Sequence, residues 1–186
     1  MQLFIKNMVC NRCIKVVSDE LTKLGYTVEE IELGRVEIKE NPTDEELNKI
    51  IEILESNGFA LIEDSKKKIT EKIKNIIIAK VHHQEGESDI PFSKIIENEI
   101  GKDYSSLSKI FSSIEQITIE HFIILQKIEK VKEYLRYGEM TLSEIAYNLG
   151  YKSVNHLSSQ FKKHTGMTAT EFKESTTQKR KPLDEV

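Results

Sequence analysis

The sequence predicts an α+β protein in which a mixed N-terminal part, residues 1–65, precedes a part built only from helices. Within residues 1–65 the apolar pattern changes between the two-residue period of strands and the 3.6-residue period of helices, whereas residues after Pro91 follow only the helical period. Residues 1–65 carry 7 basic and 14 acidic side chains, and residues 151–181 carry 7 and 2. An acidic front and a basic end predict two domains with different partners, one of them a polyanion.

Six elements are expected in residues 1–65. Alternating apolar residues predict the strands, and apolar residues at helical spacing predict two helices. Thr43 and Glu46 form a capping box at the start of the second helix, and Gly25 and Gly58 end the two helices. The expected ranges are strand 1–7, helix 11–25, strands 28–33 and 35–40, helix 43–58 and strand 59–64. This order predicts a ferredoxin-like βαββαβ domain.

The remainder of the chain is predicted to be helical. A lysine-flanked helix at 66–84 leads into the polar loop HHQEGESDIP, and apolar residues after Pro91 predict six further helices. The last residues, TQKRKPLDEV, have a low apolar content and are expected to be disordered. The predicted organisation is a domain over 1–65, a linker helix and loop over 66–90 that supplies the first helix of the helical domain, an all-α domain over 91–174 with two helix-turn-helix units, and a tail over 175–186.

Residues 141–168 have the pattern of a helix-turn-helix. Thr141 and Glu144 form a capping box, Gly150 ends the first helix and Ser153 begins the second. Uncharged polar side chains on the second helix can read base edges, and its lysines can meet phosphates. The candidate DNA contacts are Ser153, Val154, Asn155, His156, Ser158, Ser159, Gln160, Lys162 and Lys163. The spacing alone fits a DNA-binding unit and a helical hairpin with a solvated polar face equally well.

Residues 142–173, LSEIAYNLGYKSVNHLSSQFKKHTGMTATEFK, resemble the second helix-turn-helix of the AraC/XylS family of bacterial transcription regulators. The sequence departs from the family at Ala169, where Pro is usual. The resemblance implies sequence-specific binding to double-stranded DNA by two helix-turn-helix units joined by a long helix. Residues 119–138 fit that helix, with Lys127–Ile128 where the family prefers Arg–Ile.

By the same resemblance the first unit covers residues 91–116, whose stretch DYSSLSKIFS is similar to the family's S-x-x-[YH]-L-S-R-L-F. The Gly that usually follows this helix is absent, and the unit has few basic residues. The DNA contacts that the resemblance implies here are Tyr104, Ser105, Ser106, Ser108 and Lys109.

The only two cysteines, Cys10 and Cys13, lie in MVCNRC between the first strand and the first helix. A helix N-terminus lowers the pKa of a thiol, and two thiolates separated by two residues can reach one ion. Such soft donors select Cu(I), Zn(II) or another thiophilic metal over hard cations. The spacing alone also fits a redox pair, or two thiols with no special role.

Residues 1–65 resemble the heavy-metal-associated domain, the small βαββαβ module of copper chaperones and metal-pumping ATPases. Its G-M-x-C-x-x-C loop is matched by Met8, Cys10 and Cys13, with Asn7 in place of Gly. The segment NGFA is similar to the Gly–aromatic step before that family's last strand. The resemblance implies Cu(I) held by both thiolates, with Met8 supporting the loop.

Together the two motifs predict a transcription regulator that responds to a soft metal ion, Cu(I) in the first place, on Cys10 and Cys13. Zn(II) would need two further ligands, and His82 and His83 are expected to be solvent-facing linker residues instead. A thiol-redox-responsive regulator remains open, as does a metal chaperone or buffer whose helical part binds protein. In a further alternative, residues 1–65 only dimerise or dock a partner.

Other classes of function are not expected. The sequence contains no nucleophile–base pair and no phosphate-binding Gly loop, so we do not expect an enzyme. Without a run of ~20 apolar residues or a signal peptide, the chain is expected to be cytoplasmic and not bound to membrane. The expected partners are double-stranded DNA and a metal-delivering protein.

Overall fold

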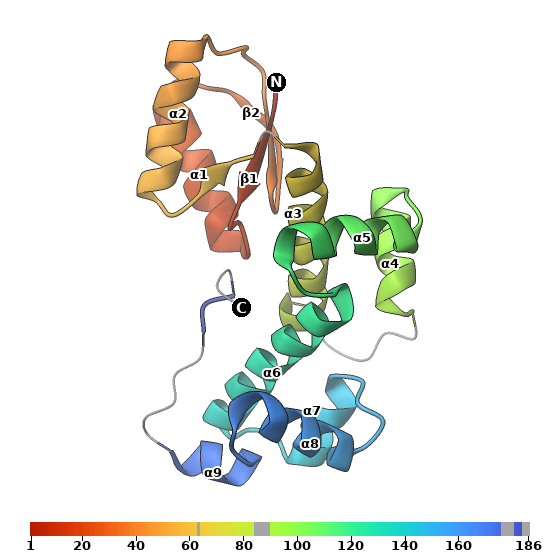
Figure 1. Ribbon diagram of the computed structural model, residues 1–186. Coiled ribbons are helices and arrows are strands. Elements are labelled where there is room, and N and C mark those ends of the chain that lie inside the picture. The colour runs from red at the N-terminus through yellow and green to blue at the C-terminus, as the bar shows by residue number, and fades with distance from the viewer. Residues whose placement is uncertain (63, 84–89, 176–180, 184–186) are drawn as a thin grey trace.

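The computed structural model describes residues 1–62, 64–83, 90–175 and 181–183 (Figure 1). Four strands form a sheet in the order β2-β3-β1-β4, with all neighbours antiparallel. The strands are β1 (Gln2–Lys6), β2 (Val28–Glu32), β3 (Arg35–Ile38) and β4 (Ala60–Leu61), and helices α1 (Asn11–Lys23) and α2 (Asp44–Ser56) follow β1 and β3. The expected order of strands and helices in residues 1–65 is confirmed.

Single residues set the turns and caps of this part. The Thr43 hydroxyl accepts from the Glu46 N–H at 3.4 Å, while the Glu46 carboxylate accepts from the Thr43 N–H at 2.8 Å, so the predicted capping box forms. Gly34, between β2 and β3, has a φ of +84°, where a side chain would be strained. A β-carbon there would lie 2.4 Å from Asn75 Nδ2, so this turn packs directly on α3 (Ser65–Ile78).

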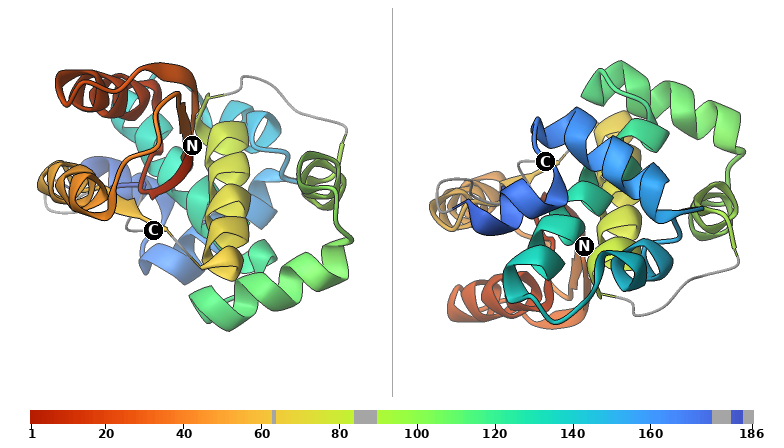
Figure 2. Two further views of the ribbon diagram at one scale, coloured as in Figure 1. Left: turned by 90° about the horizontal axis from the view of Figure 1, so that it is seen from above. Right: turned by 90° about the horizontal axis from the view of Figure 1, so that it is seen from below.

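The sheet lies between helices from both parts of the chain. Helices α1 and α2 cover one face, and α3 lies on the other (Figures 1 and 2). The face towards α1 and α2 carries the first apolar cluster, which contains Leu3, Ile5, Met8, Val17, Leu21, Val36, Ile38, Ile50, Leu54 and Phe59. Phe4 alternates with Leu3 and Ile5 along β1 and meets α3, where Lys68 Nζ lies 4.4 Å from its ring centroid.

After α3 the chain makes one π-helical turn, η1 (Ala79–His83), and the described residues continue in six α-helices. These are α4 (Phe92–Ile100), α5 (Tyr104–Glu115), α6 (Ile119–Tyr137), α7 (Leu142–Asn148), α8 (Val154–Thr165) and α9 (Ala169–Glu174). A second apolar cluster joins α3, η1, α4 and α5 to the start of α6. A third joins the rest of α6 to α7, α8 and α9. Phe122 belongs to the second cluster and Val131 to the third, so α6 is shared by both.

Parts of the expected linker and tail lie outside the described residues, namely 84–89, 176–180 and 184–186. The described tail residues lie on α6. The Lys181 N–H donates to Glu129 Oε2 at 3.1 Å, and Leu183 packs half-buried against the second cluster. Glu129 is only 4% exposed, so its carboxylate needs donors of this kind.

A partly buried imidazole makes the stability of the fold depend on pH. Burial lowers the pKa of His82 to about 4, and its Nε2 atom lies 3.0 Å from Gln126 Oε1. The unfolded chain takes up this proton near pH 6.5, so protonation favours unfolding and stability is lost as the pH falls below that value. We expect the free energy of unfolding to fall by about 2 kcal/mol between about pH 7 and pH 5 through this residue.

Urea titrations across this pH range would test the effect. The variant His82→Gln does not titrate and keeps an amide for Gln126, so its unfolding free energy should fall by about 2 kcal/mol less. Equal pH slopes in the two proteins would contradict this role of His82.

Candidate nucleic-acid interface and thiol site

The two thiols lie together at the start of α1. Cys10 is the N-cap residue of this helix, and its Sγ atom lies 3.5 Å from Cys13 Sγ. Both cysteines are reduced and half-buried, whereas Met8 is fully buried in the first cluster. Asn7 has a φ of +72°, a conformation that Gly adopts more easily than other residues. The residues Asn7 to Cys13 are called the thiol loop below.

The two thiols differ in acidity. Burial opposes ionisation of Cys10, but hydrogen bonds from Cys13 and from the Arg12 N–H, together with the Arg12 charge, outweigh it and lower the pKa of Cys10. The pKa of Cys13 is raised, chiefly by burial. Cys10 is therefore the thiol that ionises first and the more available soft donor near neutral pH.

The thiol loop contacts the helical part of the chain. The Asn7 N–H donates to Glu71 Oε1 of α3 at 3.0 Å. The Val9 carbonyl oxygen lies 2.9 Å from His83 Nε2 of η1, and the Val9 side chain packs against the second cluster. These contacts join residues far apart in sequence, and no spacing in the sequence identifies Glu71 or His83 as neighbours of the thiols.

Neither histidine of η1 is a simple solvent-facing linker residue. His82 is partly buried and contacts Gln126, so that expectation is wrong for His82 because η1 packs on α6. His83 is exposed but contacts the thiol loop. Among the described residues, no group of three or more His, Cys, Asp or Glu side chains is placed to hold a metal ion. Within that part of the chain the two cysteines therefore have no third side chain of these types grouped with them.

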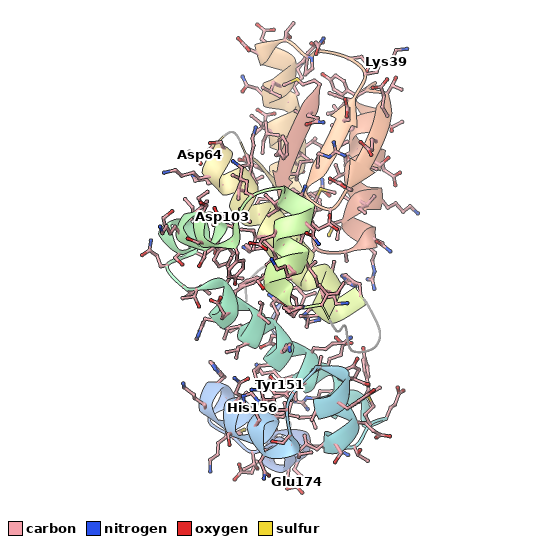
Figure 3. All side chains as sticks on the ribbon, turned by 90° about the vertical axis from the view of Figure 1, so that its right-hand side faces the viewer. Lys39, Asp64, Asp103, Tyr151, His156 and Glu174 are labelled. Carbon is pink, nitrogen blue, oxygen red and sulfur yellow. The ribbon has the colours of Figure 1, made fainter. Side chains whose placement is uncertain are left out.

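Helices α7 and α8 form the second helix-turn-helix unit. Thr141 and Glu144 form the expected capping box of α7. Ser153 caps α8, and its hydroxyl accepts from the His156 N–H at 3.1 Å. Figure 3 shows Tyr151 and His156 close together near the start of α8, and their ring centroids are 5.4 Å apart. The second helix is therefore fixed at its first turn by a cap and by an aromatic contact.

The outward face of α8 carries most of the residues expected from the sequence. Leu157 and Phe161 are fully buried, and the opposite face is polar. The exposed members of the expected set are Ser153, Asn155, His156, Ser159, Lys162 and Lys163. Ser158 and Gln160 are half-buried, and Val154 packs against the third cluster, so its side chain is partly used by the core.

Helices α4 and α5 form the first unit, which has a different surface. Ser105, Ser106 and Lys109 are exposed, and Ser108 is half-buried. The Tyr104 hydroxyl donates to Glu120 Oε1 at 2.6 Å, and burial together with this bond raises the pKa of Tyr104. The hydroxyl of Tyr104 is therefore already engaged within the protein.

Lys127 of α6 connects the two units. Its Nζ atom donates to the Leu149 carbonyl at the end of α7 at 2.5 Å. The same atom lies 5.3 Å from the Tyr151 ring centroid and 5.9 Å from that of Phe92 in α4. One cation on the shared helix thus lies between both helix-turn-helix units.

Comparison with known proteins identifies this helical part. Residues 97–175 match the family described as Helix-turn-helix domain, from within α4 to the end of α9. The C-terminal domain of AraT, a response regulator from Geobacillus stearothermophilus, has a similar fold, with a TM-score of 0.50 and 20% identity over 63% of this chain and 97% of that one. Residues 97–175 are an AraC/XylS-type helix-turn-helix domain. Domains of this type bind DNA in transcription regulators and are not enzymes.

Two further solved structures are similar to the chain. The C-terminal domain of the two-component response regulator yesN from Fusobacterium nucleatum subsp. nucleatum ATCC 25586 is 25% identical over 56% of this chain and 96% of that one, with a TM-score of 0.48. A DNA-binding transcriptional dual regulator from Escherichia coli K-12 is 18% identical over 57% and 89%, with a TM-score of 0.48. No curated protein has significant sequence similarity to the chain. Within the described residues, no helix has the length and apolar character needed to cross a membrane.

The Lys127 contact of this helix-turn-helix domain can be tested by its effect on stability. In Lys127→Met the long side chain keeps its packing, but the Leu149 carbonyl loses this donor. We expect the free energy of unfolding to fall by about 1–3 kcal/mol. Urea unfolding would measure the loss, and Lys127→Arg, which keeps N–H donors, should recover part of it. Unchanged stability in the Met variant would show that the bond contributes nothing.

Proposed function

We propose that this protein is a sequence-specific transcription regulator that responds to a soft metal ion, Cu(I) in the first place, bound by Cys10 and Cys13. One observation carries the proposal: the two sulfur atoms lie 3.5 Å apart in a loop that contacts α3 and η1, the elements that lead into the helix-turn-helix domain. A change at the thiols therefore has a physical route to the DNA-binding part.

The donor set of the thiol loop suits a soft ion of low coordination number. Two thiolates select soft metals, and the lowered pKa of Cys10 favours the anionic form that binds them. A tetrahedral Zn(II) site would need two more ligands, and no group of three or more candidate ligands occurs among the described residues. Met8 lies within the first cluster and supports the loop. Cu(I) is therefore favoured over Zn(II), and a metal-delivering protein remains a proposed partner.

The likeness of residues 1–65 to heavy-metal-associated domains also supports the proposal. The element order βαββαβ and the strand order β2-β3-β1-β4 support the ferredoxin-like fold that we propose for this part. The family match of residues 97–175 does not include this part, so its assignment rests on the sequence resemblance and the topology.

On the DNA side we propose α8 as the recognition helix. Asn155, His156 and Ser159 are exposed on its outer face and can reach base edges in a major groove, whereas Lys162 and Lys163 can meet phosphates. Ser153, Val154, Ser158 and Gln160 complete this proposed surface. The first unit offers the exposed Ser105, Ser106 and Lys109, with Ser108 and the engaged Tyr104 beside them.

A thiol-redox switch is the second candidate. The sulfur separation of 3.5 Å is favourable for closing a disulfide, whose S–S bond is about 2.05 Å long. In that case oxidation, and not metal, would change the DNA affinity.

The DNA surface predicts two different classes of variant. Lys163→Ala removes a phosphate contact, so binding should weaken by a similar factor on all sequences, and the slope of log K against log salt should become shallower by about 0.9.

Asn155→Ala should instead relax preference at one base position at a cost of about 1–3 kcal/mol. Site selection and salt titrations would measure both, and unchanged sequence preference in Asn155→Ala would contradict α8 as recognition helix.

The metal response predicts a shift in DNA affinity under reducing conditions. A site-selected duplex would be titrated with apo protein, with protein carrying one equivalent of Cu(I), and with Cys10→Ser/Cys13→Ser under both conditions. We expect Cu(I) to change the Kd of the parent by roughly 5-fold or more, as is typical of coupled sites, and to leave the double variant unchanged. Anisotropy at one salt concentration would measure this.

The same experiment separates the redox alternative. An affinity that responds to a thiol oxidant without metal, and not to Cu(I), would replace the metal proposal by the redox one. An affinity that responds to neither would show that the thiol loop does not regulate DNA binding.

A further inference from the structure

The turn η1 (Ala79–His83) joins the thiol loop to α6. A π-helical turn is rare, and such turns are frequent at functional sites. Its last two residues contact different parts of the protein. His83 Nε2 lies 2.9 Å from the Val9 carbonyl oxygen, and His82 Nε2 lies 3.0 Å from Gln126 Oε1 of α6. Two adjacent side chains thus bridge from the residue before Cys10 to the helix shared by both helix-turn-helix units.

Two hydrogen bonds from other elements fix the backbone of the thiol loop beside Cys10. A carbonyl oxygen only accepts, so His83 donates its Nε2–H to Val9. On the other side of Met8, the Asn7 N–H donates to Glu71 of α3 at 3.0 Å. The backbone just before Cys10 is therefore held at two points, by α3 and by η1, and a movement of Asn7 or Val9 changes the corresponding contact.

The connection continues along α6. The His82 carbonyl accepts from Lys130 Nζ at 3.4 Å, and Gln126 is fully buried. The next residue, Lys127, donates to the Leu149 carbonyl at the end of α7 and lies over the Tyr151 ring. Tyr151 contacts His156 at the start of α8. Hydrogen bonds and ring contacts therefore run from the thiol loop through η1 and α6 to the proposed recognition helix.

We propose that η1 transmits the state of the thiol loop to α6, and that His83 is the positioning residue through which the loop acts. This inference rests on the proposed metal response. Drawing both sulfur atoms onto one ion changes the loop around Val9 and Cys10, and the His83 hydrogen bond then differs in strength between the two states. Such a difference between states is what coupling between two sites requires. His83 binds no metal in this scheme.

The test uses the full chain and separates metal binding from its effect on DNA binding. His83→Ala removes the donor at an exposed position, and His83→Gln keeps an N–H donor on a neutral side chain of similar reach. Cu(I) affinity is measured by competition with a colorimetric chelator. DNA affinity is measured by anisotropy with and without one equivalent of Cu(I). Circular dichroism and thermal unfolding confirm that each variant is folded.

In the parent we expect Cu(I) to change the Kd for DNA by roughly 5-fold or more. In His83→Ala that ratio should fall close to 1 while Cu(I) still binds with one equivalent, and His83→Gln should recover most of the ratio. A purely structural role of His83 would change Tm or basal DNA affinity and leave the ratio intact.

The outcomes also distinguish this inference from the proposed function. If the parent responds to Cu(I) and His83→Ala responds equally, the role of η1 and His83 is wrong and the metal-responsive function stands. If the parent binds Cu(I) and its DNA affinity does not change, the proposed function fails and this inference fails with it.

Discussion

The packing of two apolar clusters on one helix is the constraint on which the rest of this structure depends. Helix α6 has 19 residues, which corresponds to a length of about 28 Å. Phe122 near its start belongs to the second cluster, and Val131 and Leu135 near its end belong to the third. The separation of the two helix-turn-helix units is therefore set by the length of one rigid element.

The shared helix also explains why its polar residues are buried. Gln126, Glu129 and Lys132 are each less than 10% exposed, which is unusual for these residue types. Lys132 Nζ and Glu129 Oε1 pair at 2.5 Å, and Gln126 meets His82 and the Leu183 carbonyl. A helix that is apolar along two cluster faces must place its remaining side chains against neighbours such as η1 and the tail. These polar contacts fix the position of α6 relative to its neighbours, because hydrogen bonds need a defined geometry. Apolar packing alone would tolerate small shifts of the helix.

The sequence predicted the helix caps and apolar helix faces, because these depend on interactions between residues close together in the chain. The capping boxes at Thr43 and Thr141, the Ser153 cap and the apolar faces of α7 and α8 depend on residues within a few positions of one another. The packing of η1 on α6 was not predictable in the same way. His82 follows a lysine-flanked helix and precedes a polar segment, so its surroundings favoured a solvent-facing linker. Its burial arises because Gln126, 44 residues later, meets it from another helix.

In the candidate site, too, features within one short segment could be predicted from the sequence, whereas features that need tertiary packing could not. The residue types on α8 and the two thiols could be identified from spacing and resemblance, because each set lies within one short segment. Other features depend on how separate elements pack against each other. These are the hydrogen bond from Tyr104 to Glu120, the partial burial of Val154 and the hydrogen bond from His83 to the Val9 carbonyl. Side-chain accessibility on the proposed recognition surface is thus a tertiary property, even though the helix that carries it could be predicted from the sequence.

The interface between the sheet and α3 differs in kind from the three apolar clusters. Thr70, Glu71 and Asn75 are each at most 6% exposed along α3. Glu71 accepts from the Asn7 N–H, whereas Thr70 Oγ1 and both amide atoms of Asn75 have no hydrogen-bond partner among the described residues. Buried polar groups without partners cost free energy, so this arrangement is held less firmly than an apolar core of equal size. Polar interfaces between folded parts of a chain rearrange more readily than apolar ones, and the regulation that we propose for the thiol loop would use this property.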